Sequence, residues 1–262
     1  MKSLLIYLIL LPSFCSCFAG VLVAQDTDLE QLFRKSGIEG TIIISSLDGT
    51  QEFVHNRTRA EQRFLPASTF KIPHSLIALD EQALRDQNEV IPWDGIDKGW
   101  QRWNKDQTLV TALPDSCIWF YQELATRIGN ASYLTHLGNI EYGNMKTGSE
   151  LTTFWLNGDL AVSAREQIQF LKKLYHNELP YSRNHLELVK KLLIVKSTPD
   201  AVIRAKTGWA MRIENQHGWY VGYVEKKDET WFFATNIAIK KKQDSRYREV
   251  LTLQALKVKK IL

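Results

Sequence analysis

The strongest constraint on the fold is that strand-like segments lie at both ends of the chain, while helical patterns fill the middle. A β-branched run at 41–45 leads to Asp48-Gly49, a strong hairpin signal, and 51–55 reads as the returning strand. Three further segments are rich in Val, Ile, Trp, Tyr and Phe: 201–207, 218–225 and 230–239. The two ends must build one antiparallel sheet, so we predict an α/β fold of the α+β type.

Helical periodicity dominates the segment between these strands. Apolar residues recur at three- and four-residue spacing in 74–85, 115–128, 164–176 and 185–193. Flanking helices are expected at 28–36 and 246–262. With 262 residues and 44% hydrophobic composition, the chain can bury one substantial core shared by two lobes. We expect a sheet lobe at about 25–60 and 197–262, flanked by helices, and an inserted helical lobe at about 61–196.

The N-terminus has the form of a signal peptide. Lys2 precedes an apolar run at 4–11, and the small residues Ala19 and Ala24 follow. The run is shorter than the ~20 residues of a membrane span, so no stable membrane insertion is expected. We predict a signal peptide at 1–24 and a mature domain at 25–262, exported across the inner membrane to the periplasm. Cleavage after Ala19 also fits.

The cysteines divide at the predicted cleavage site. Cleavage would remove Cys15 and Cys17; a lipoprotein cysteine there is an alternative, but Phe14 and Ser16 fit it poorly. Cys117 then remains alone and cannot form an internal disulfide. It lies in an apolar run without a basic neighbour, which favours a buried structural cysteine over a nucleophile.

Charge and histidine spacing exclude several classes of function. The net charge is only +4, and Lys240-Lys241-Lys242, the longest basic run, reads as a solvated loop, so no nucleic-acid partner is expected. No pair of histidines has the spacing of metal ligands, and we predict no metal. No Gly-x-Ser-x-Gly elbow supports a Ser-His-Asp hydrolase. The six histidines are His55, His74, His136, His176, His185 and His217.

The first candidate for chemistry is the Ser-x-x-Lys motif at Ser68 and Lys71. On a helical turn the two side chains share one face, so the amine can reach the hydroxyl and activate it. A lysine with its ordinary pKa of ~10.4 is charged at pH 7, but burial among the apolar neighbours can lower that pKa. Pro73 should make this turn irregular, and the helix start offers free N–H groups for an oxyanion. On its own, a Ser-x-x-Lys tetrad is expected to occur by chance about once in a chain of this length.

The second candidate is Lys-Thr-Gly, which occurs twice. Lys206-Thr207-Gly208 ends a strand-like run, and at a sheet edge its lysine and threonine could hold a substrate carboxylate. Its glycine would let the substrate approach the backbone closely. The copy at 146–148 lies in a turn-rich stretch without a preceding strand, and we interpret it as a loop coincidence.

The third candidate is Ser116, placed near the start of the helix expected at 115–128. Its hydroxyl could relay a proton between Lys71 and a leaving group. Alone, it would be interpreted as a helix-capping serine.

Together, Ser-x-x-Lys, Ser-x-apolar, Tyr142-Gly143-Asn144 and a strand-borne Lys-Thr-Gly resemble the ordered motifs of penicillin-recognising serine enzymes. The chain is most similar to class D β-lactamases, over nearly all of the mature chain. The resemblance implies a β-lactamase/transpeptidase-like fold, hydrolysis of a small-molecule β-lactam through a serine acyl-enzyme, antibiotic resistance, and a monomer or homodimer. The further matching stretches are 66–79, 93–95, 154–158, 163–167 and 204–209.

The same resemblance implies the roles of individual residues. Lys71 would be carboxylated by carbon dioxide or bicarbonate, with no other cofactor, and its carbamate would be the base in both half-reactions. The Trp155 indole would hold the carbamate, Ile118 and Leu156 would line its pocket, and Ser116 would protonate the lactam nitrogen. The backbone N–H groups of Ser68 and Trp209 would form the oxyanion hole. The implied substrate-binding residues are Lys206, Thr207, Gly208, Trp209 and Arg248; Arg248 is placed by the match of 248–256 to the final helix of the family.

The sequence departs from the family pattern at two places, and one alternative function remains. The family usually has valine where Ile118 stands, which leaves the deacylation rate and the bicarbonate dependence open. The stretch 210–217 resembles a loop of some carbapenem-hydrolysing members, which raises carbapenem hydrolysis as a hypothesis. The rival function is a β-lactam sensor domain that is acylated without turnover. Such sensors usually follow several membrane helices, and the sequence indicates only a signal peptide, so we prefer the enzyme.

Overall fold

The computed structural model describes residues 26–262, so the predicted signal peptide at 1–24, with Cys15 and Cys17, lies outside the described residues. A six-stranded sheet is ordered β2-β1-β6-β5-β4-β3, and every neighbouring pair is antiparallel. Pairing of β1 with β6, from Gly40–Ile237 to Ser46–Trp231, confirms that the two ends of the chain share one sheet. The strands are β1 (Gly40–Ser46), β2 (Glu52–His55), β3 (Ile194–Ser197), β4 (Val202–Ala210), β5 (His217–Glu225) and β6 (Thr230–Ala238).

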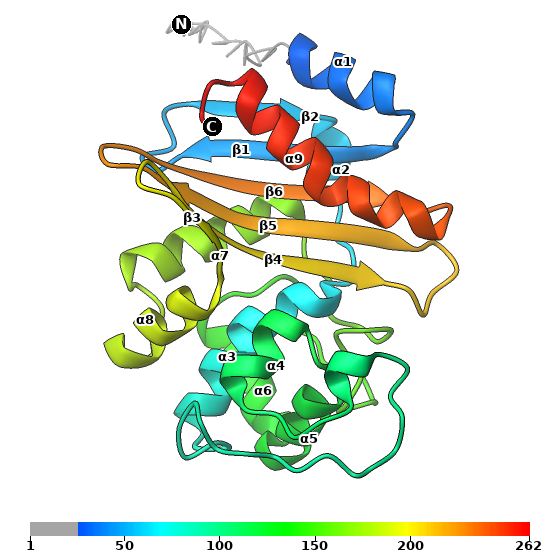
Figure 1. The fold of residues 1–262 in the computed structure, drawn as a ribbon, viewed down its shortest axis with the longest axis vertical. Coiled ribbons are helices and arrows are strands. Elements are labelled where there is room, and N and C mark those ends of the chain that lie inside the picture. The colour runs from blue at the N-terminus through cyan, green and yellow to red at the C-terminus, as the bar shows by residue number, and fades with distance from the viewer. Residues whose placement is uncertain (1–25) are drawn as a thin grey trace, which may run out of the picture.

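Helices cover both faces of the sheet and form a separate lobe beside it (Figure 1). One face carries α1 and α9, the other carries α7, and α3 to α6 lie together beyond β4. No helix within residues 26–262 is both long and apolar enough to cross a membrane. The helices are α1 (Thr27–Ser36), α2 (Arg57–Glu61), α3 (Lys71–Asp80), α4 (Leu109–Asp115), α5 (Ile118–Ile128), α6 (Asn130–Asn139), α7 (Ala164–His176), α8 (Arg183–Leu192) and α9 (Tyr247–Val258); the 3₁₀ turns are η1 (Ala67–Phe70), η2 (Gln101–Trp103) and η3 (Lys242–Arg246).

Strand alternation explains how one sheet supports two cores. On β6, Phe233 belongs to the cluster under α1 and α9, whereas Phe232 and Ala234 belong to the cluster on the opposite side. Since both faces are covered, β5 and β6 are buried along almost their whole length. This explains why they read as continuous hydrophobic runs and not as alternating ones.

The observed helix boundaries correct three predictions. The helix expected at 74–85 begins earlier, at Lys71, and ends at Asp80. The helix expected at 115–128 is broken, because α4 ends at Asp115 and α5 begins at Ile118. Ser116 ends α4 in the left-handed conformation, with φ 58°, and does not begin a helix. The short strand β3 was not predicted; its four residues are all exposed and follow α8 almost directly.

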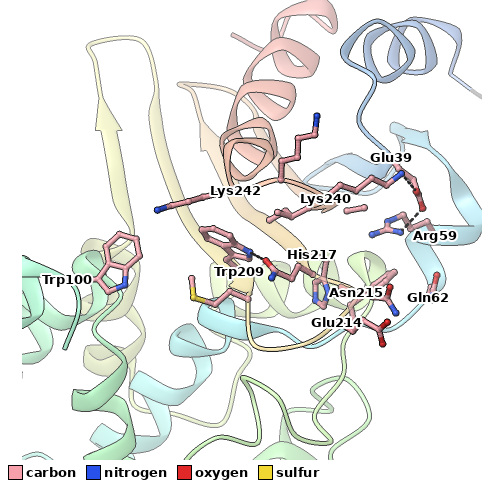
Figure 2. A pocket seen from close by; sticks show the side chains of 16 residues that line it. Glu39, Arg59, Gln62, Trp100, Trp209, Glu214, Asn215, His217, Lys240 and Lys242 are labelled. Atoms are coloured by element: carbon pink, nitrogen blue, oxygen red, sulfur yellow. Dashed lines mark hydrogen bonds and ion pairs between the residues drawn. The ribbon is translucent and has the colours of Figure 1, made fainter. Parts of the chain in front are cut away.

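One end of the sheet is closed by the β4–β5 loop and by the segment that follows β6. The Ile239 amide donates a hydrogen bond to the carbonyl of Gln216, at 2.9 Å. The side chain of Gln216 in turn accepts a hydrogen bond from the Trp209 indole, at 3.1 Å. Figure 2 shows this end of the sheet, with Trp209 and His217 between the loop and the lysines that follow β6.

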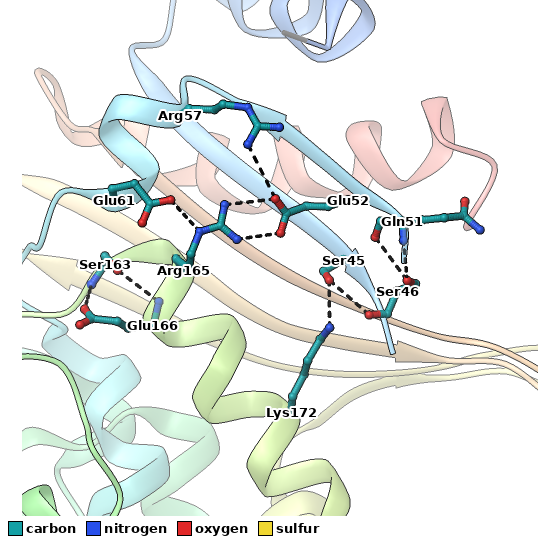
Figure 3. Close-up of polar contacts among 10 residues, drawn as sticks. All are labelled: Ser45, Ser46, Gln51, Glu52, Arg57, Glu61, Ser163, Arg165, Glu166 and Lys172. Atoms are coloured by element: carbon teal, nitrogen blue, oxygen red, sulfur yellow. Dashed lines mark hydrogen bonds and ion pairs between the residues drawn. The ribbon is translucent and has the colours of Figure 1, made fainter. Parts of the chain in front are cut away.

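Ion pairs and a hydrogen bond tie α7 to β1, β2 and α2 (Figure 3). Arg165 donates to Glu52 at 2.7 Å and to Glu61 at 2.6 Å, and Lys172 donates to Ser45 at 3.0 Å. Ser163 and Glu166 form a capping box at the start of α7. The Ser163 hydroxyl accepts the Glu166 N–H, and the Glu166 carboxylate accepts the Ser163 N–H. Although α7 falls in the sequence range expected for the helical lobe, it packs on the sheet.

Candidate active site

Ser68 lies on a tight 3₁₀ turn that runs directly into α3. Ala67 has a φ of 47°, and the Thr69 hydroxyl donates to the Pro66 carbonyl at 2.7 Å, so this bond closes the turn around Ser68. Pro73 has no N–H to donate back to Thr69, in agreement with the predicted irregular first turn. The Lys71 amine donates to the Ser68 hydroxyl at 3.0 Å. The predicted serine–lysine pair is therefore formed.

The Lys71 side chain is fully buried. Burial, assisted by the positive charge of Arg212, lowers the pKa of the amine to about 7. The Tyr121 ring lies 5.1 Å from the amine, and the Tyr121 hydroxyl is 2.7 Å from that of Ser75, which donates to the Lys71 carbonyl. A large share of this amine is neutral near pH 7, so it can accept a proton.

A second serine–lysine pair faces the cleft from the sheet side. The Lys206 amine, on β4, donates to the Ser116 hydroxyl at 2.9 Å and to the Thr207 carbonyl at 3.1 Å. Burial lowers its pKa well below the usual value, and the charges of Lys71 and Arg248 add to this effect. Ser116 follows the last residue of α4 as its C-cap, and from there its hydroxyl accepts the hydrogen bond from Lys206.

Gly208 brings β4 against the Ser68 turn. A Cβ at this glycine would lie 2.9 Å from the Pro66 carbonyl and 3.2 Å from the Thr69 methyl group. The structure thus gives the glycine a role in packing within the chain, beside the expected approach of substrate. The Gly208 carbonyl accepts a hydrogen bond from Arg248, at 3.2 Å. Since β3 pairs with β4 only at Val202–Arg204, the segment from Lys206 onward lies at an open sheet edge.

These elements enclose a cleft of about 240 Å³. Lys71, Lys206 and Trp155 are buried behind its wall. Predicted residues that line the cleft are Ser68, Ser116, Ile118, Leu156, Thr207, Gly208, Trp209 and Arg248. Met211 and Arg212, from the stretch 210–217 noted in the sequence, also line it. Lining residues that the sequence did not single out are Trp100, Arg102, Trp103, Pro114 and Asp115. Tryptophans in a loop rich in Gly and Asp, at 93–103, are the signal that could have found part of this wall.

Trp155 is the unusual residue behind the cleft. It is fully buried, and its indole N–H has no hydrogen-bond partner in the described part of the chain. Its ring packs against Phe70 and His74, which flank Lys71 on the same turn. An unsatisfied buried donor costs about 1–3 kcal/mol. An unpaired buried donor that packs on the two residues flanking Lys71 fits a carbamate on this lysine, because that group would supply an acceptor.

Two alternatives from the sequence are settled by their surroundings. Cys117 is buried, and burial raises the pKa of its thiol to about 11, as predicted for a structural cysteine. The second Lys-Thr-Gly, at 146–148, lies in a loop, as predicted. Its Gly148 has a φ of 70° and packs against Asp159.

Comparison with known proteins agrees with this geometry. Residues 32–257 match the family described as the penicillin binding protein transpeptidase domain. The chain is 41% identical to β-lactamase OXA-48 of Klebsiella pneumoniae, over 88% of this chain and 87% of that protein. It is 40% identical to β-lactamase OXA-3 of Pseudomonas aeruginosa, over 88% and 84% respectively.

Solved structures give the same result. The class D β-lactamase from Sebaldella termitidis superposes with a TM-score of 0.87 at 34% identity, covering 91% of this chain and 98% of that one. FUS-1 (OXA-85), a class D β-lactamase from Fusobacterium nucleatum, gives 0.87 at 32% identity, covering 89% and 98%. The chain therefore belongs to the class D β-lactamases.

Proposed function

We propose that the protein hydrolyses the amide bond of β-lactam antibiotics through an acyl-enzyme on Ser68, and so confers resistance to them. The observation that carries this proposal is the fully buried Lys71 amine, 3.0 Å from the Ser68 hydroxyl and with its pKa lowered to about 7. A serine hydroxyl becomes a nucleophile only when a neighbouring base takes its proton. The names of the relatives, all β-lactamases, support the same reaction.

The base at Lys71 is proposed to be a carbamate. A neutral amine adds carbon dioxide by forming a nitrogen–carbon bond and losing one proton, which leaves an anionic, oxygen-based acceptor. Trp155 would hold it through the unpaired indole N–H, and Ile118 and Leu156 lie on the adjoining wall of the cleft. Such a group supplies one base for both half-reactions without a separate carboxylate side chain.

Acylation follows from the two serine–lysine pairs. The base at Lys71 takes the proton of Ser68, whose oxygen bonds to the lactam carbonyl carbon. The N–H groups of Ser68 and Trp209 stabilise the negative charge on the carbonyl oxygen. The carbon–nitrogen bond then breaks, and the nitrogen takes a proton from the Ser116 hydroxyl, which Lys206 contacts at 2.9 Å. Ser116 recovers a proton from the base at Lys71, which is then free to accept another.

Deacylation uses the same base on water. A water molecule gives a proton to the base at Lys71, and its oxygen bonds to the acyl carbon. The bond between that carbon and the Ser68 oxygen breaks, Ser68 recovers a proton from the base at Lys71, and the open product leaves. Thr207 and Arg248 line the cleft, and Lys206 lies buried next to Thr207 on β4. These three residues are proposed to bind the substrate carboxylate throughout.

The test is turnover of a chromogenic cephalosporin, followed with mass spectrometry of the protein. Wild type should turn over many equivalents, whereas Ser68→Ala should show neither turnover nor an acyl adduct. A stoichiometric burst without turnover would instead favour the sensor. Labelled ¹³C-bicarbonate should give a carbamate NMR signal that Lys71→Ala removes; a signal that persists in this variant would refute the carbamate at Lys71.

We also propose export to the periplasm, since the first 24 residues have the form of a signal peptide. Cell fractionation should recover activity in the periplasmic fraction, and N-terminal sequencing should begin at Gln25. Recovery of the full-length chain in the cytoplasm would contradict this proposal.

A further inference from the structure

A second and larger hollow lies directly beside the catalytic cleft. It has a volume of about 960 Å³, at the end of the sheet where the β4–β5 loop meets the segment after β6. We call it the cationic groove and define it by Arg59, Lys240, Lys241 and Lys242, which line it with two carboxylates, Glu39 and Glu214 (Figure 2). Its volume is within the range of small-molecule sites.

The positive charges of the cationic groove are only partly balanced. Glu39 is the carboxylate nearest to both Arg59, at 3.5 Å, and Lys240, at 3.6 Å. Within residues 26–262, neither Lys241 nor Lys242 has a carboxylate within 4.0 Å. His217, also in the wall, has its pKa lowered by burial and adds no charge at pH 7. The groove therefore presents four cations against two carboxylates.

Hydrogen bonds within the protein hold Arg59 and the backbone of the lysine segment in place. Arg59, whose side chain is only 12% exposed, is held by two hydrogen bonds to the neutral amide oxygen of Asn236, at 2.8 and 3.1 Å. The Asp244 carboxylate accepts the backbone N–H groups of Lys240 and Lys241, at 3.1 and 2.8 Å. That carboxylate orders the lysine segment through its backbone, so the lysine amines can bind a ligand.

The cationic groove and the cleft share a wall. Trp100, Trp209 and Met211 line both hollows. Figure 2 shows Lys242 pointing toward Trp209 and Trp100, while Lys240 points toward Glu39 at the far end. A ligand with negative groups at both ends would meet cations at each end and the Trp209 side chain between them.

We propose that the cationic groove is a second binding site, which takes a small polyanion carrying two or more carboxylate or phosphate groups. Charge-assisted hydrogen bonds from the lysine amines and the Arg59 guanidinium provide the recognition. Occupancy would restrain Trp209, whose backbone is part of the catalytic edge of β4. The site thus couples an anionic ligand to the shape of the cleft.

Binding is tested by isothermal titration calorimetry on the mature protein at low ionic strength, with sodium pyrophosphate and, separately, citrate. The groove variant is Lys241→Gln/Lys242→Gln, and the matched control is Lys191→Gln/Lys227→Gln, which removes the same charge from exposed sites elsewhere. Arg248→Ala reports binding in the catalytic cleft. Thermal melting of each variant checks that it is folded.

Wild type and the control should bind alike, the groove variant should bind roughly tenfold more weakly, and Arg248→Ala should keep its affinity. A stronger response to pyrophosphate or to citrate identifies the phosphate or the carboxylate source. Loss of binding in Arg248→Ala alone would place the anion in the cleft and overturn the proposal. Equal weakening in the groove variant and the control, or no binding by wild type, would overturn it too.

The coupling to catalysis rests on the proposed function and is measured separately. Saturating pyrophosphate should change the KM of wild type for a chromogenic cephalosporin and leave that of the groove variant unchanged. Binding without any change in KM would refute the coupling, and absence of turnover under all conditions would refute the proposed function.

Discussion

Two lysines at the base of one cleft differ in what surrounds their amines. Lys71 and Lys206 both contact a serine hydroxyl, at 3.0 and 2.9 Å, and burial lowers the pKa of both. Lys206 also donates to a strand carbonyl and faces Ser116 across the cleft. The Lys71 amine lies 5.1 Å from the Tyr121 ring, and the flanking Phe70 and His74 pack against Trp155. The buried Trp155 indole N–H has no partner among the described residues.

The comparison teaches that burial alone does not assign a lysine its role. Burial weakens the basicity of both amines, but Lys206 keeps two acceptors that favour its charged form. At Lys71 the unpaired group nearby is a donor, which favours an added anion. We therefore expect Lys71 to be the base and Lys206 to act as a donor and substrate contact.

Exchanging each lysine for alanine gives the largest effect. Lys71→Ala should lower kcat for a chromogenic cephalosporin by about 10³-fold or more, because general-base catalysis contributes about 10²–10⁴-fold. Lys206→Ala should act mainly on KM. Steady-state kinetics of both variants test this difference.

Lys190→Ala is the matched control, since Lys190 is a buried lysine on α8 outside the cleft. It should retain wild-type kinetics even if its melting temperature falls. If Lys206→Ala lost kcat as severely as Lys71→Ala with KM unchanged, the two lysines would not have the distinct roles argued here.

The pH dependence of activity is the next largest effect. The folded-state pKa of Lys71 is lowered to about 7, so the amine is neutral above that pH and protonated below it. Carbon dioxide adds only to the neutral amine, so kcat/KM should fall as the pH drops through 7, by about tenfold per pH unit. Added bicarbonate should restore part of the loss. A flat profile between pH 5 and 8 would exclude Lys71 as the titrating base.

Removing the unpaired indole donor should have an intermediate effect. Trp155→Phe should lower kcat by about 10- to 100-fold, because a hydrogen bond to a charged group contributes ~1.5–3 kcal/mol. Excess bicarbonate should recover part of this activity. Trp219→Phe is the control: Trp219 is equally buried, but its indole donates to the Leu65 carbonyl. That variant should lose stability without becoming dependent on bicarbonate.

Truncating a cation on the Lys206 side should affect binding more than chemistry. Arg248→Ala should raise KM about tenfold for substrates that carry a carboxylate, with kcat largely kept, since a charge-assisted contact is lost. Arg246→Ala, on the preceding 3₁₀ turn and outside the cleft, is the control. An unchanged KM in Arg248→Ala would remove this arginine from the carboxylate site.

Local sequence patterns predicted the parts of this site that depend on short spacing. The Ser68–Lys71 contact follows from an i, i+3 turn, and Lys206-Thr207-Gly208 was placed correctly because it ends a β-branched run. The meeting of β1 with β6 followed from strands at both ends of the chain. In each case the residue types at adjacent positions in the sequence were enough to predict the feature.

Features set by long-range packing could not be predicted from the sequence. Ser116 was placed at a helix start, because the helical periodicity of this stretch continues across the break at Ser116 and Cys117. The unpaired state of the Trp155 indole depends on contacts with α3, which is distant in sequence. Exposed loop residues such as Trp100 and Arg212 have no periodicity, so only the structure shows that they line the cleft.

The smallest expected effect concerns the wall beside Lys71, and it sharpens the comparison most. Ile118 begins α5 and lines the cleft with Leu156. Ile118→Val removes one methylene, worth ~0.8 kcal/mol, so the rate of deacylation should change by only about two- to fourfold. A smaller side chain admits water more easily, which should raise kcat in excess bicarbonate. Without added bicarbonate, activity should decline faster with time than that of wild type. Ile194→Val, on the exposed strand β3, is the control. If kcat and the bicarbonate requirement both stayed at wild-type values, access of water to Lys71 would be governed by other residues, with Leu156 the next to test.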